Sequence, residues 1–354
     1  MAHPDVASIA DLPAFDAIVD VRSPGEYAED RIPGAWNCPV LDDAERARVG
    51  TMYAQESPFA ARKVGAALVA RNIAHHIETR FADFPRGWRP LVYCWRGGQR
   101  SGSMTLVLRQ IGWDARQLGG GYRAFRRSVV ADLEVLPGRH RFRVICGPTG
   151  SGKSRLLRAL QSRGAQVLDL EALASHRGSL LGDIPAEAQP TQKAFETSVW
   201  AALRGFDPAR PVFVEAESKR IGKLRVPEIL IDRMRSSTCL RVRSDSAVRV
   251  DLLMQEYEHF FATPERLGTI LDALVPLHGH EVVRQWKRWI DAADWPTLVR
   301  DLLDRHYDPA YGRSIASHFV GYAEADELTV AGLDDYDRVA AELAASPSTS
   351  EVSA

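Results

Sequence analysis

The sequence is poor in cysteine: it has four among 354 residues, and they are widely spaced and form no C-x-x-C pair. This spacing argues against a disulfide framework and a zinc ribbon, so we expect reduced thiols. Long apolar runs are also missing, because no stretch of ~18 apolar residues occurs. The N-terminal residues lack the basic and then apolar profile of a signal peptide. We therefore expect a cytoplasmic protein with no membrane partner.

The sequence also lacks a net charge of either sign. Its 45 Lys and Arg residues nearly balance 46 Asp and Glu residues, which leaves a formal charge of -1. This balance excludes a uniformly basic nucleic-acid coat and an acidic solvating chain, so any surface that binds anions must be local. Hydrophobic residues at 45% and charged residues at 26% are ordinary for a globular protein.

Short apolar segments alternate with helical patterns in two successive sets, which predicts an α/β protein with parallel sheets. The first set of strand-like segments comprises residues 16–21, 35–40, 89–94 and 114–118. The second set comprises residues 141–147, 165–170, 211–217 and 238–243. The length and these patterns predict a first domain over 1–136, an α/β domain over 137–245, its helical C-terminal part over 246–345 and a disordered tail over 346–354.

The most specific motif is GPTGSGKS, a full G-x-x-x-x-G-K-[ST] P-loop between an apolar strand and a helix. Its glycines let several backbone N–H groups turn toward one phosphate chain. Lys153 is expected to reach the terminal phosphates, and Ser154 is expected to hold a Mg²⁺ ion. The predicted phosphate-binding residues here are Gly147, Thr149, Gly150, Ser151, Gly152, Lys153 and Ser154.

A P-loop usually works with a carboxylate at the end of another strand. Asp169, Glu215 and Glu217 are the candidate acids, and Glu171 lies near the first of them. Each of these can equally be a solvated acid at a strand end. The motif therefore predicts binding of a polyphosphate or diphosphate before it predicts ATP hydrolysis.

A second constellation is YCWRGGQRS, in which a cysteine ends an apolar strand and precedes a glycine-containing loop. Inward-facing backbone N–H groups of such a loop favour a thiolate and bind an anion beside it. Cys94 is therefore the predicted nucleophile, with Arg96 and Arg100 adding positive charge and Gly97 and Gly98 contributing amides. The other cysteines, Cys38, Cys146 and Cys239, lie in apolar strand patterns and are expected to be core residues.

Arginines cluster between Gly121 and Arg143, which makes this segment the best candidate for an RNA contact. A solvated helix face is the alternative explanation for such a cluster. The candidate RNA-binding residues are Arg123, Arg126, Arg127, Arg139, Arg141 and Arg143.

The first domain resembles the rhodanese family over roughly residues 5–135. The resemblance rests on DVRSPGEYAEDRIPGAWNCPV, on the YCWRGGQRS loop and on LGGGYRAF. Two departures matter: Arg31 stands where many rhodaneses have histidine, and the Cys94–Arg100 spacing is one residue longer than in the commoner sulfurtransferases. The longer loop also resembles that of cysteine-based phosphatases, so sulfur, selenium and phosphoryl chemistry all stay open.

The whole chain resembles the tRNA 2-selenouridine synthase family, in which a rhodanese-like domain precedes a P-loop domain. Further matching strings are HRGSLLG, VEAESKRIG and the long segment that begins LDDAERARVG. The resemblance implies a transferase that replaces sulfur by selenium in 2-thiouridine at the tRNA wobble position, with selenophosphate as donor. It also implies S-geranylation of that thiouridine from geranyl diphosphate.

On this resemblance, tRNA is the expected partner, selenophosphate synthetase is a candidate second partner, and no tightly bound cofactor is expected. Cys94 would act as a perselenide carrier or as a nucleophile, and the P-loop would hold the diphosphate. Two other functions stay open from the residues. One is a cysteine-dependent phosphatase fused to a P-loop small-molecule kinase, and the other is a nucleotide-switched binding module with a silent rhodanese-like domain.

Overall fold

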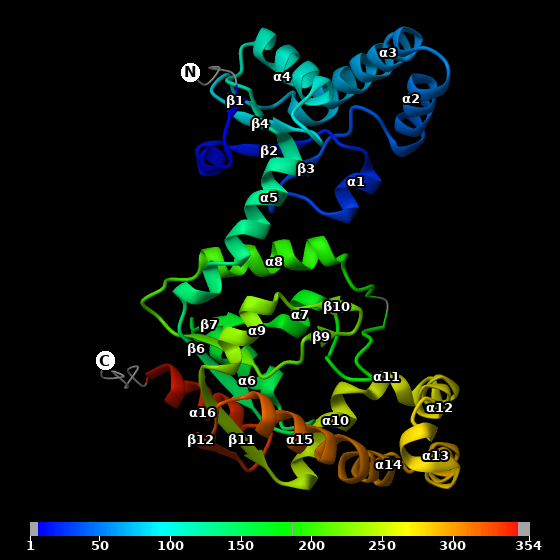
Figure 1. Cartoon of the computed structure of the whole chain (residues 1–354), viewed down its shortest axis with the longest axis vertical. Helices are drawn as coiled ribbons and strands as arrows, with labels where there is room; N and C mark the ends of the chain where they lie inside the picture. The colour runs from blue at the N-terminus through cyan, green and yellow to red at the C-terminus, as the bar shows by residue number, and fades with distance from the viewer. Residues whose placement is uncertain (1–5, 186, 346–354) are drawn as a thin grey trace. The chain divides into compact units, whose positions relative to one another are not determined.

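The computed structural model describes residues 6–185 and 187–345 (Figure 1). The chain divides into two compact units. Unit 1 contains Met1–Glu134 and Pro190–Ala201, and unit 2 contains Val135–Gln189 and Ala202–Ala354. The division at 134/135 lies beside the expected boundary, whereas the sequence did not indicate that residues 190–201 join unit 1. The tail expected over 346–354 lies outside the described residues.

Unit 1 contains a five-stranded sheet in which each pair of neighbouring strands is parallel. The order is β1 (Val6–Ala7), β5 (Arg116–Leu118), β4 (Pro90–Tyr93), β2 (Ala17–Asp20) and β3 (Trp36–Asn37). All four residues of β4 are buried, as expected for a central strand with both faces covered. The carboxyl end of β4 therefore leads directly from the core into the Cys94 loop.

Two helices of unit 1, α2 and α3, have side-chain caps that the sequence provides. Ser57 caps α3 and is followed by Pro58 at its first position, and Asp42 caps α2 through the backbone N–H of Glu45. The helices are α1 (Pro24–Glu29), α2 (Asp43–Gln55), α3 (Pro58–His76), α4 (Gln99–Ile111) and α5 (Gly121–Leu133), with short turns at Ile9–Ala14 and Ile77–Phe81.

The first part of α8 (Gln192–Gly205) belongs to unit 1 because of specific polar contacts. The Thr197 hydroxyl donates to the Asp30 carboxylate at 3.0 Å. The indole N–H of Trp200 donates to Asp132 at 2.8 Å. These contacts join segments more than 65 residues apart, so no local pattern predicts them.

Unit 2 contains a second five-stranded parallel sheet. Its order is β12 (Gly321–Val330), β11 (Thr238–Ser244), β6 (Phe142–Cys146), β8 (Val212–Glu215) and β7 (Gln166–Leu168). The predicted parallel α/β class is thus confirmed for both units. Because β6, β7 and β8 are parallel, the P-loop and the acids that follow β7 and β8 meet at one edge of the sheet.

Helices surround the sheet of unit 2 and continue into a helical C-terminal part (Figure 1). The earlier ones are a turn at Leu136–Arg139, α6 (Lys153–Ser162), α7 (Leu170–Ala174) and α9 (Glu228–Arg235), with a hairpin of β9 (Arg220–Ile221) and β10 (Leu224–Arg225). The later ones are α10 (Ser246–Glu256), α11 (Glu258–Phe261), α12 (Pro264–Asp272), α13 (Val275–Asp291), α14 (Trp295–Leu302), a π-helical turn at Leu303–Tyr307, α15 (Asp308–His318) and α16 (Asp335–Ala345). Within the described residues, no helix has the length and apolar character needed to cross a membrane.

The helical expectation for residues 246–345 is wrong over 321–330, where the chain forms β12. This segment is rich in alanine and glutamate, which favour helix locally. In the fold it lies along β11, with Leu240 opposite Asp326 and Val242 opposite Leu328. The pairing satisfies the backbone groups at an edge of β11 that would otherwise be open, and this tertiary gain overrides the local propensity.

Candidate functional site

The predicted nucleophile lies in a loop between β4 and α4 of unit 1. Cys94 directly follows β4 and is only 3% exposed. The backbone N–H of Gly98 donates to its Sγ at 3.3 Å, and the Ser101 hydroxyl donates to it at 3.1 Å. The sulfur therefore accepts hydrogen bonds from a backbone amide of its own loop and from a hydroxyl at the start of α4.

Two opposing effects act on the pKa of Cys94. Burial raises it, whereas hydrogen bonds from the Ser101 hydroxyl and from the amides of Ser101, Gly98 and Arg96 lower it. The hydrogen bonds outweigh burial, and the pKa of Cys94 lies below the ordinary thiol value. Burial instead raises the pKa of Cys38, where the Arg80 guanidinium only partly offsets it. Cys94 is thus suited to react as a thiolate.

The LGGGYRAF segment packs its backbone against the Cys94 loop. Gly121 has a φ of +56°, and a Cβ there would lie 2.3 Å from the carbonyl oxygen of Cys94. The next amide, of Tyr122, donates to that same oxygen at 2.9 Å. A side chain at position 121 would break this backbone contact, which explains why the resemblance to rhodaneses includes glycine here.

The two arginines predicted to bind an anion occupy different environments. Arg100 makes a bidentate ion pair with Glu26 of α1, at 2.7 and 3.2 Å. Arg96 is exposed, and within the described part of the chain its guanidinium has no ion pair. Glu26 thus fixes the Arg100 guanidinium beside the loop, while Arg96 remains available to an incoming anion. Sequence reasoning missed Glu26, because 74 residues separate the two partners.

Ser101 connects Cys94 to a third side chain. Nε2 of Gln117 donates to the Ser101 hydroxyl at 2.7 Å and to the Gly98 carbonyl at 3.0 Å. Because the hydroxyl oxygen accepts from Gln117, its own proton can point toward the sulfur. Sequence reasoning did not assign Ser101 or Gln117 a role, although Ser101 ends the YCWRGGQRS motif.

We expect Ser101→Ala to raise the pKa of Cys94. A hydrogen bond to a charged acceptor is worth about 1.5–3 kcal/mol, which corresponds to a shift of about one to two pH units. The pH dependence of iodoacetamide alkylation, measured by mass spectrometry of the Cys94 peptide, should move upward by that amount. Ser103→Ala on the same helix is the control, and an unchanged midpoint in Ser101→Ala would contradict the role of Ser101.

The P-loop of unit 2 connects β6 to α6, as the motif predicts. Its lysine folds back, and Nζ of Lys153 donates to the carbonyl of Gly147 at 3.0 Å. Gly152 has a φ of +74°, and a Cβ there would clash with the Tyr336 ring of α16. The Tyr336 hydroxyl donates to the Ser151 carbonyl at 3.0 Å. Sequence reasoning missed this support, because it comes from 185 residues further along the chain.

A cavity of about 640 Å³ lies over the P-loop, entirely within unit 2. Its wall includes Thr149, Gly150, Gly152, Lys153 and Ser154 of the predicted phosphate cradle, together with all the candidate acids. Gly147 and Ser151 do not line it: the amide of Gly147 donates to the Tyr311 hydroxyl at 2.6 Å, and Ser151 is buried. The cavity is large enough for a small phosphorylated ligand.

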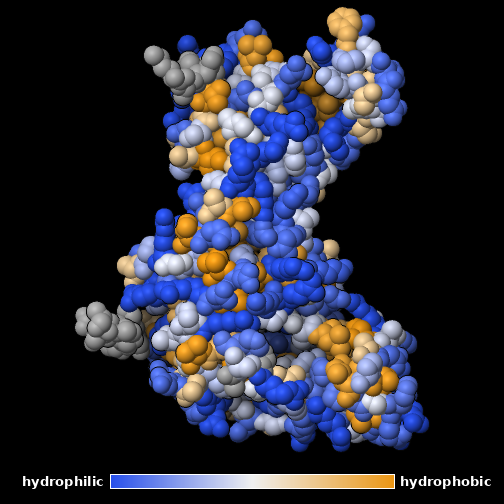
Figure 2. Space-filling view, viewed as in Figure 1, coloured by the Kyte–Doolittle hydropathy of each residue, from blue (hydrophilic) through white to orange (hydrophobic). Residues whose placement is uncertain are grey.

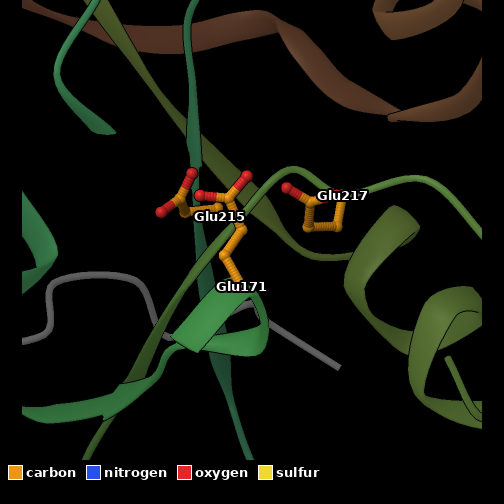
Figure 3. Close-up of side chains that lie close together, drawn as sticks. All are labelled: Glu171, Glu215 and Glu217. Carbon is orange, nitrogen blue, oxygen red and sulfur yellow. The ribbon is translucent and has the colours of Figure 1, made fainter. Parts of the chain in front are cut away.

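Three glutamates meet beside the P-loop (Figure 3). Glu171, Glu215 and Glu217 each offer a carboxylate oxygen, and these oxygens lie within 4.8 Å of one another. The Ser154 hydroxyl donates to Oε2 of Glu171 at 3.3 Å. Oε1 of Glu215 is buried without a hydrogen-bond partner among the described residues. Asp169 instead caps α7 by accepting from the Ala172 amide at 2.9 Å.

Burial and repulsion by neighbouring carboxylates raise the pKa of all three carboxyls. Burial is the largest cause in each. The pKa is about 10 for Glu171 and about 8 for Glu217, which Glu215 also repels, and about 6 for Glu215, which Asp169 and Glu256 repel. Lys153 acts in the opposite direction on each of them. Protons or a bound cation would stabilise this cluster of three glutamates, because either reduces the repulsion between the carboxylates. Carboxylate oxygens are also the ligands that Mg²⁺ prefers.

We expect Glu171→Gln to stabilise the metal-free protein at alkaline pH. The pKa of Glu171 is about 10 in the folded state against 4.5 as its ordinary value, so wild-type stability falls as pH rises through this range. A glutamine side chain stays neutral at every pH. The melting temperature of the Glu171→Gln variant should therefore exceed that of wild type by about 3 °C or more at pH 9. Thermal melts in EDTA between pH 5 and pH 9 measure this, with exposed Glu228→Gln as control. Parallel curves for wild type and Glu171→Gln would contradict it.

The six candidate RNA-binding arginines divide between the units. In unit 1, Arg123 and Arg127 are exposed, whereas Arg126 makes an ion pair with Glu196 and is half-buried. In unit 2, Arg141 donates to the carbonyl of Ala209, Arg143 stacks on Phe213, and Arg139 is exposed.

Comparison with known proteins bears on both units. A family model described as a rhodanese-like domain matches residues 5–128, and one described as the tRNA 2-selenouridine synthase AAA domain matches residues 140–269. A tRNA 2-selenouridine synthase from Nitrosomonas europaea is 36% identical over 301 residues, which cover 81% of this chain and 77% of the relative. The chain belongs to the tRNA 2-selenouridine synthase family.

Other members of the tRNA 2-selenouridine synthase family extend this match. A synthase from a Sulfurovum species is 34% identical over 88% of this chain and 93% of its own length. One from Bdellovibrio bacteriovorus is 37% identical over 68% of this chain and 64% of its own length. A solved N-terminal domain from Clostridium difficile 630 is 35% identical over 35% of this chain and 98% of that domain, with a TM-score of 0.33.

Proposed function

We propose that this chain replaces sulfur by selenium in 2-thiouridine at the wobble position of tRNA, by way of an S-geranylated intermediate. Selenophosphate is the proposed selenium donor, and geranyl diphosphate is the proposed source of the geranyl group. The observation that carries the proposal is the Cys94 loop, where a buried sulfur receives a backbone N–H and a hydroxyl in a member of this family.

The P-loop is suited to the geranyl step. The thiouridine sulfur would attack C1 of geranyl diphosphate, the C1–O bond would break, and the diphosphate would leave with its electron pair. Lys153 would release the Gly147 carbonyl to stabilise this leaving charge. Ser154 with Glu171 and Glu215 would hold Mg²⁺, which offsets the diphosphate charge when bound.

The selenium step then needs a good leaving group on C2. Selenium of selenophosphate, supplied by a selenophosphate synthetase, would attack C2, and the C2–S bond would break to release geranylthiol. The Cys94 thiolate would then attack phosphorus, and the Se–P bond would break with its electrons on selenium. Water would release phosphate from Cys94. Arg96 and the amides of Gly97 and Gly98 would bind the phosphoryl group.

This sequence of steps assigns Cys94 the role of a nucleophile. Selenium in selenophosphate is at the selenide level, so a perselenide on Cys94 would require an added oxidant. Transfer of the phosphoryl group requires none, and the lowered pKa of Cys94 favours the thiolate that it needs.

Binding of tRNA in this proposal depends on local positive charge. We expect neutralisation of the exposed Arg123 and Arg127 to glutamine to weaken tRNA binding and to lower the salt dependence by about 0.7–0.9 per lost phosphate contact. Binding titrations at several salt concentrations measure the slope. Arg89→Gln, at an exposed ion pair with Asp16, is the control. An unchanged slope would place the RNA contact elsewhere.

Mass spectrometry of wobble nucleosides tests the proposed function directly. Wobble nucleosides of cells that contain this protein should include 2-selenouridine, whereas cells from which the protein has been deleted should retain 2-thiouridine. Hydrolysis of aryl phosphates through Cys94, with no change in the wobble nucleosides, would instead support a phosphatase fused to a kinase.

A further inference from the structure

A second cavity adjoins the P-loop cavity in unit 2. It has a volume of about 50 Å³. Thr149, Leu253, Tyr257 and Tyr307 line both cavities, so they form the mouth between them. We call this second cavity the apolar chamber. Its other wall residues come from the helical C-terminal part and from the loop after α7: Leu181, Phe260, Phe261, Leu267, Leu298, Val299, Leu302 and Leu303.

The chamber wall is almost free of polar groups. Among the described residues of the wall, only Thr149 and the two tyrosines carry side-chain oxygens, and they lie at the mouth. Burial raises the pKa of Tyr257 and Tyr307, so both hydroxyls stay neutral. Figure 2 shows further hydrophobic side chains gathered on the visible face of unit 2, where Figure 1 draws α11 to α14. A purine base would lose its hydrogen bonds in such a chamber, whereas a hydrocarbon would lose none.

Part of the chamber wall belongs to the buried core. Phe260, Leu267 and Leu298 line the apolar chamber but not the P-loop cavity. They belong to the buried core of the helical part, with exposures of 2%, 4% and 1%. A group of the size of a water molecule needs roughly 10–15 Å³ of cavity volume. The 50 Å³ of the chamber therefore has room for about four such groups. This matches the end of one five-carbon isoprenyl unit and leaves no room for a second.

We propose that the apolar chamber binds the terminal isoprenyl unit of a prenyl diphosphate and limits the length of its chain. The proposal rests on the proposed function, in which the P-loop holds the diphosphate. The phosphate cradle and the chamber share Thr149, so one ligand with a charged head and a hydrocarbon tail occupies both. A ten-carbon chain fits with its first unit in the larger cavity, and a fifteen-carbon chain meets the wall at Phe260 and Leu298.

Calorimetric titration of the full chain with inorganic diphosphate, geranyl diphosphate and farnesyl diphosphate tests this. Val299 is half-buried in the chamber wall, so Val299→Phe should fill the chamber. We expect it to weaken geranyl diphosphate binding at least tenfold and to leave inorganic diphosphate binding unchanged. Arg300→Phe places the same ring on the exposed side of α14 and is the matched control.

A second variant tests chain length independently. Leu298→Ala removes a buried side chain from the chamber wall and enlarges the chamber, and we expect it to reduce the preference for geranyl over farnesyl diphosphate at least fivefold. Unchanged affinity of Val299→Phe for geranyl diphosphate, or an unchanged preference in Leu298→Ala, would overturn the chamber assignment. Inorganic diphosphate binding reports correct folding of each variant. If the wild-type chain binds geranyl diphosphate no better than inorganic diphosphate, the geranyl step of the proposed function fails instead.

Discussion

Cys94→Ser is expected to abolish selenium incorporation while tRNA still acquires the geranyl group. A serine hydroxyl stays protonated near neutral pH, whereas the loop lowers the pKa of the Cys94 thiol. Loss of the nucleophile should therefore reduce 2-selenouridine formation by about three orders of magnitude or more. Mass spectrometry of nucleosides from reactions with thiolated tRNA, geranyl diphosphate and selenophosphate measures both products.

The control for this variant is Cys38→Ala, which removes a buried thiol of the same unit whose pKa is raised rather than lowered. It should keep both activities unless the fold is damaged, which circular dichroism would show. Full selenation by Cys94→Ser would rule out Cys94 as the nucleophile. Loss of geranylation in Cys94→Ser would show that the two steps are not separate.

Lys153→Ala is expected to have the opposite pattern, with geranyl transfer lost and selenation of pre-geranylated tRNA retained. The lysine is the cation of the P-loop, and its side chain already contacts the loop carbonyls of Gly147 and Pro148. Removal of one preorganised charge or donor at a leaving group typically costs about 10²–10³ in rate. Single-turnover geranylation of thiolated tRNA measures this loss.

Lys223→Ala, at an exposed lysine of the same unit, is the matched control and should behave as wild type. Reactions with and without ATP complete the test, because the diphosphate assignment requires no ATP. Intact geranyl transfer in Lys153→Ala, or an absolute need for ATP hydrolysis, would contradict the assignment and favour a kinase-like use of the P-loop.

The two loops could be predicted from short strings of residues because their chemistry is local. GPTGSGKS and YCWRGGQRS each contain the strand end, the glycines and the helix start that build an anion-binding loop. The contact of the Gly98 amide with Cys94 follows from such a string alone, whereas the hydrogen bond of Lys153 to the Gly147 carbonyl does not. The alternation of apolar strands and helices likewise indicated parallel sheets before the register was known.

Only the tertiary structure decided which distant side chains contact those two loops. Glu26 binds Arg100, Tyr336 supports the P-loop, and Glu171 joins Glu215 from a different strand end. The strand β12 also forms only because β11 offers it an open edge. By itself the sequence determined the fold class and the place of the two candidate loops, since neighbours in the chain supply the glycines, the cysteine and the lysine of those loops. The supporting side chains come from positions 17 to 185 residues away, where chain proximity predicts nothing and only packing brings them together.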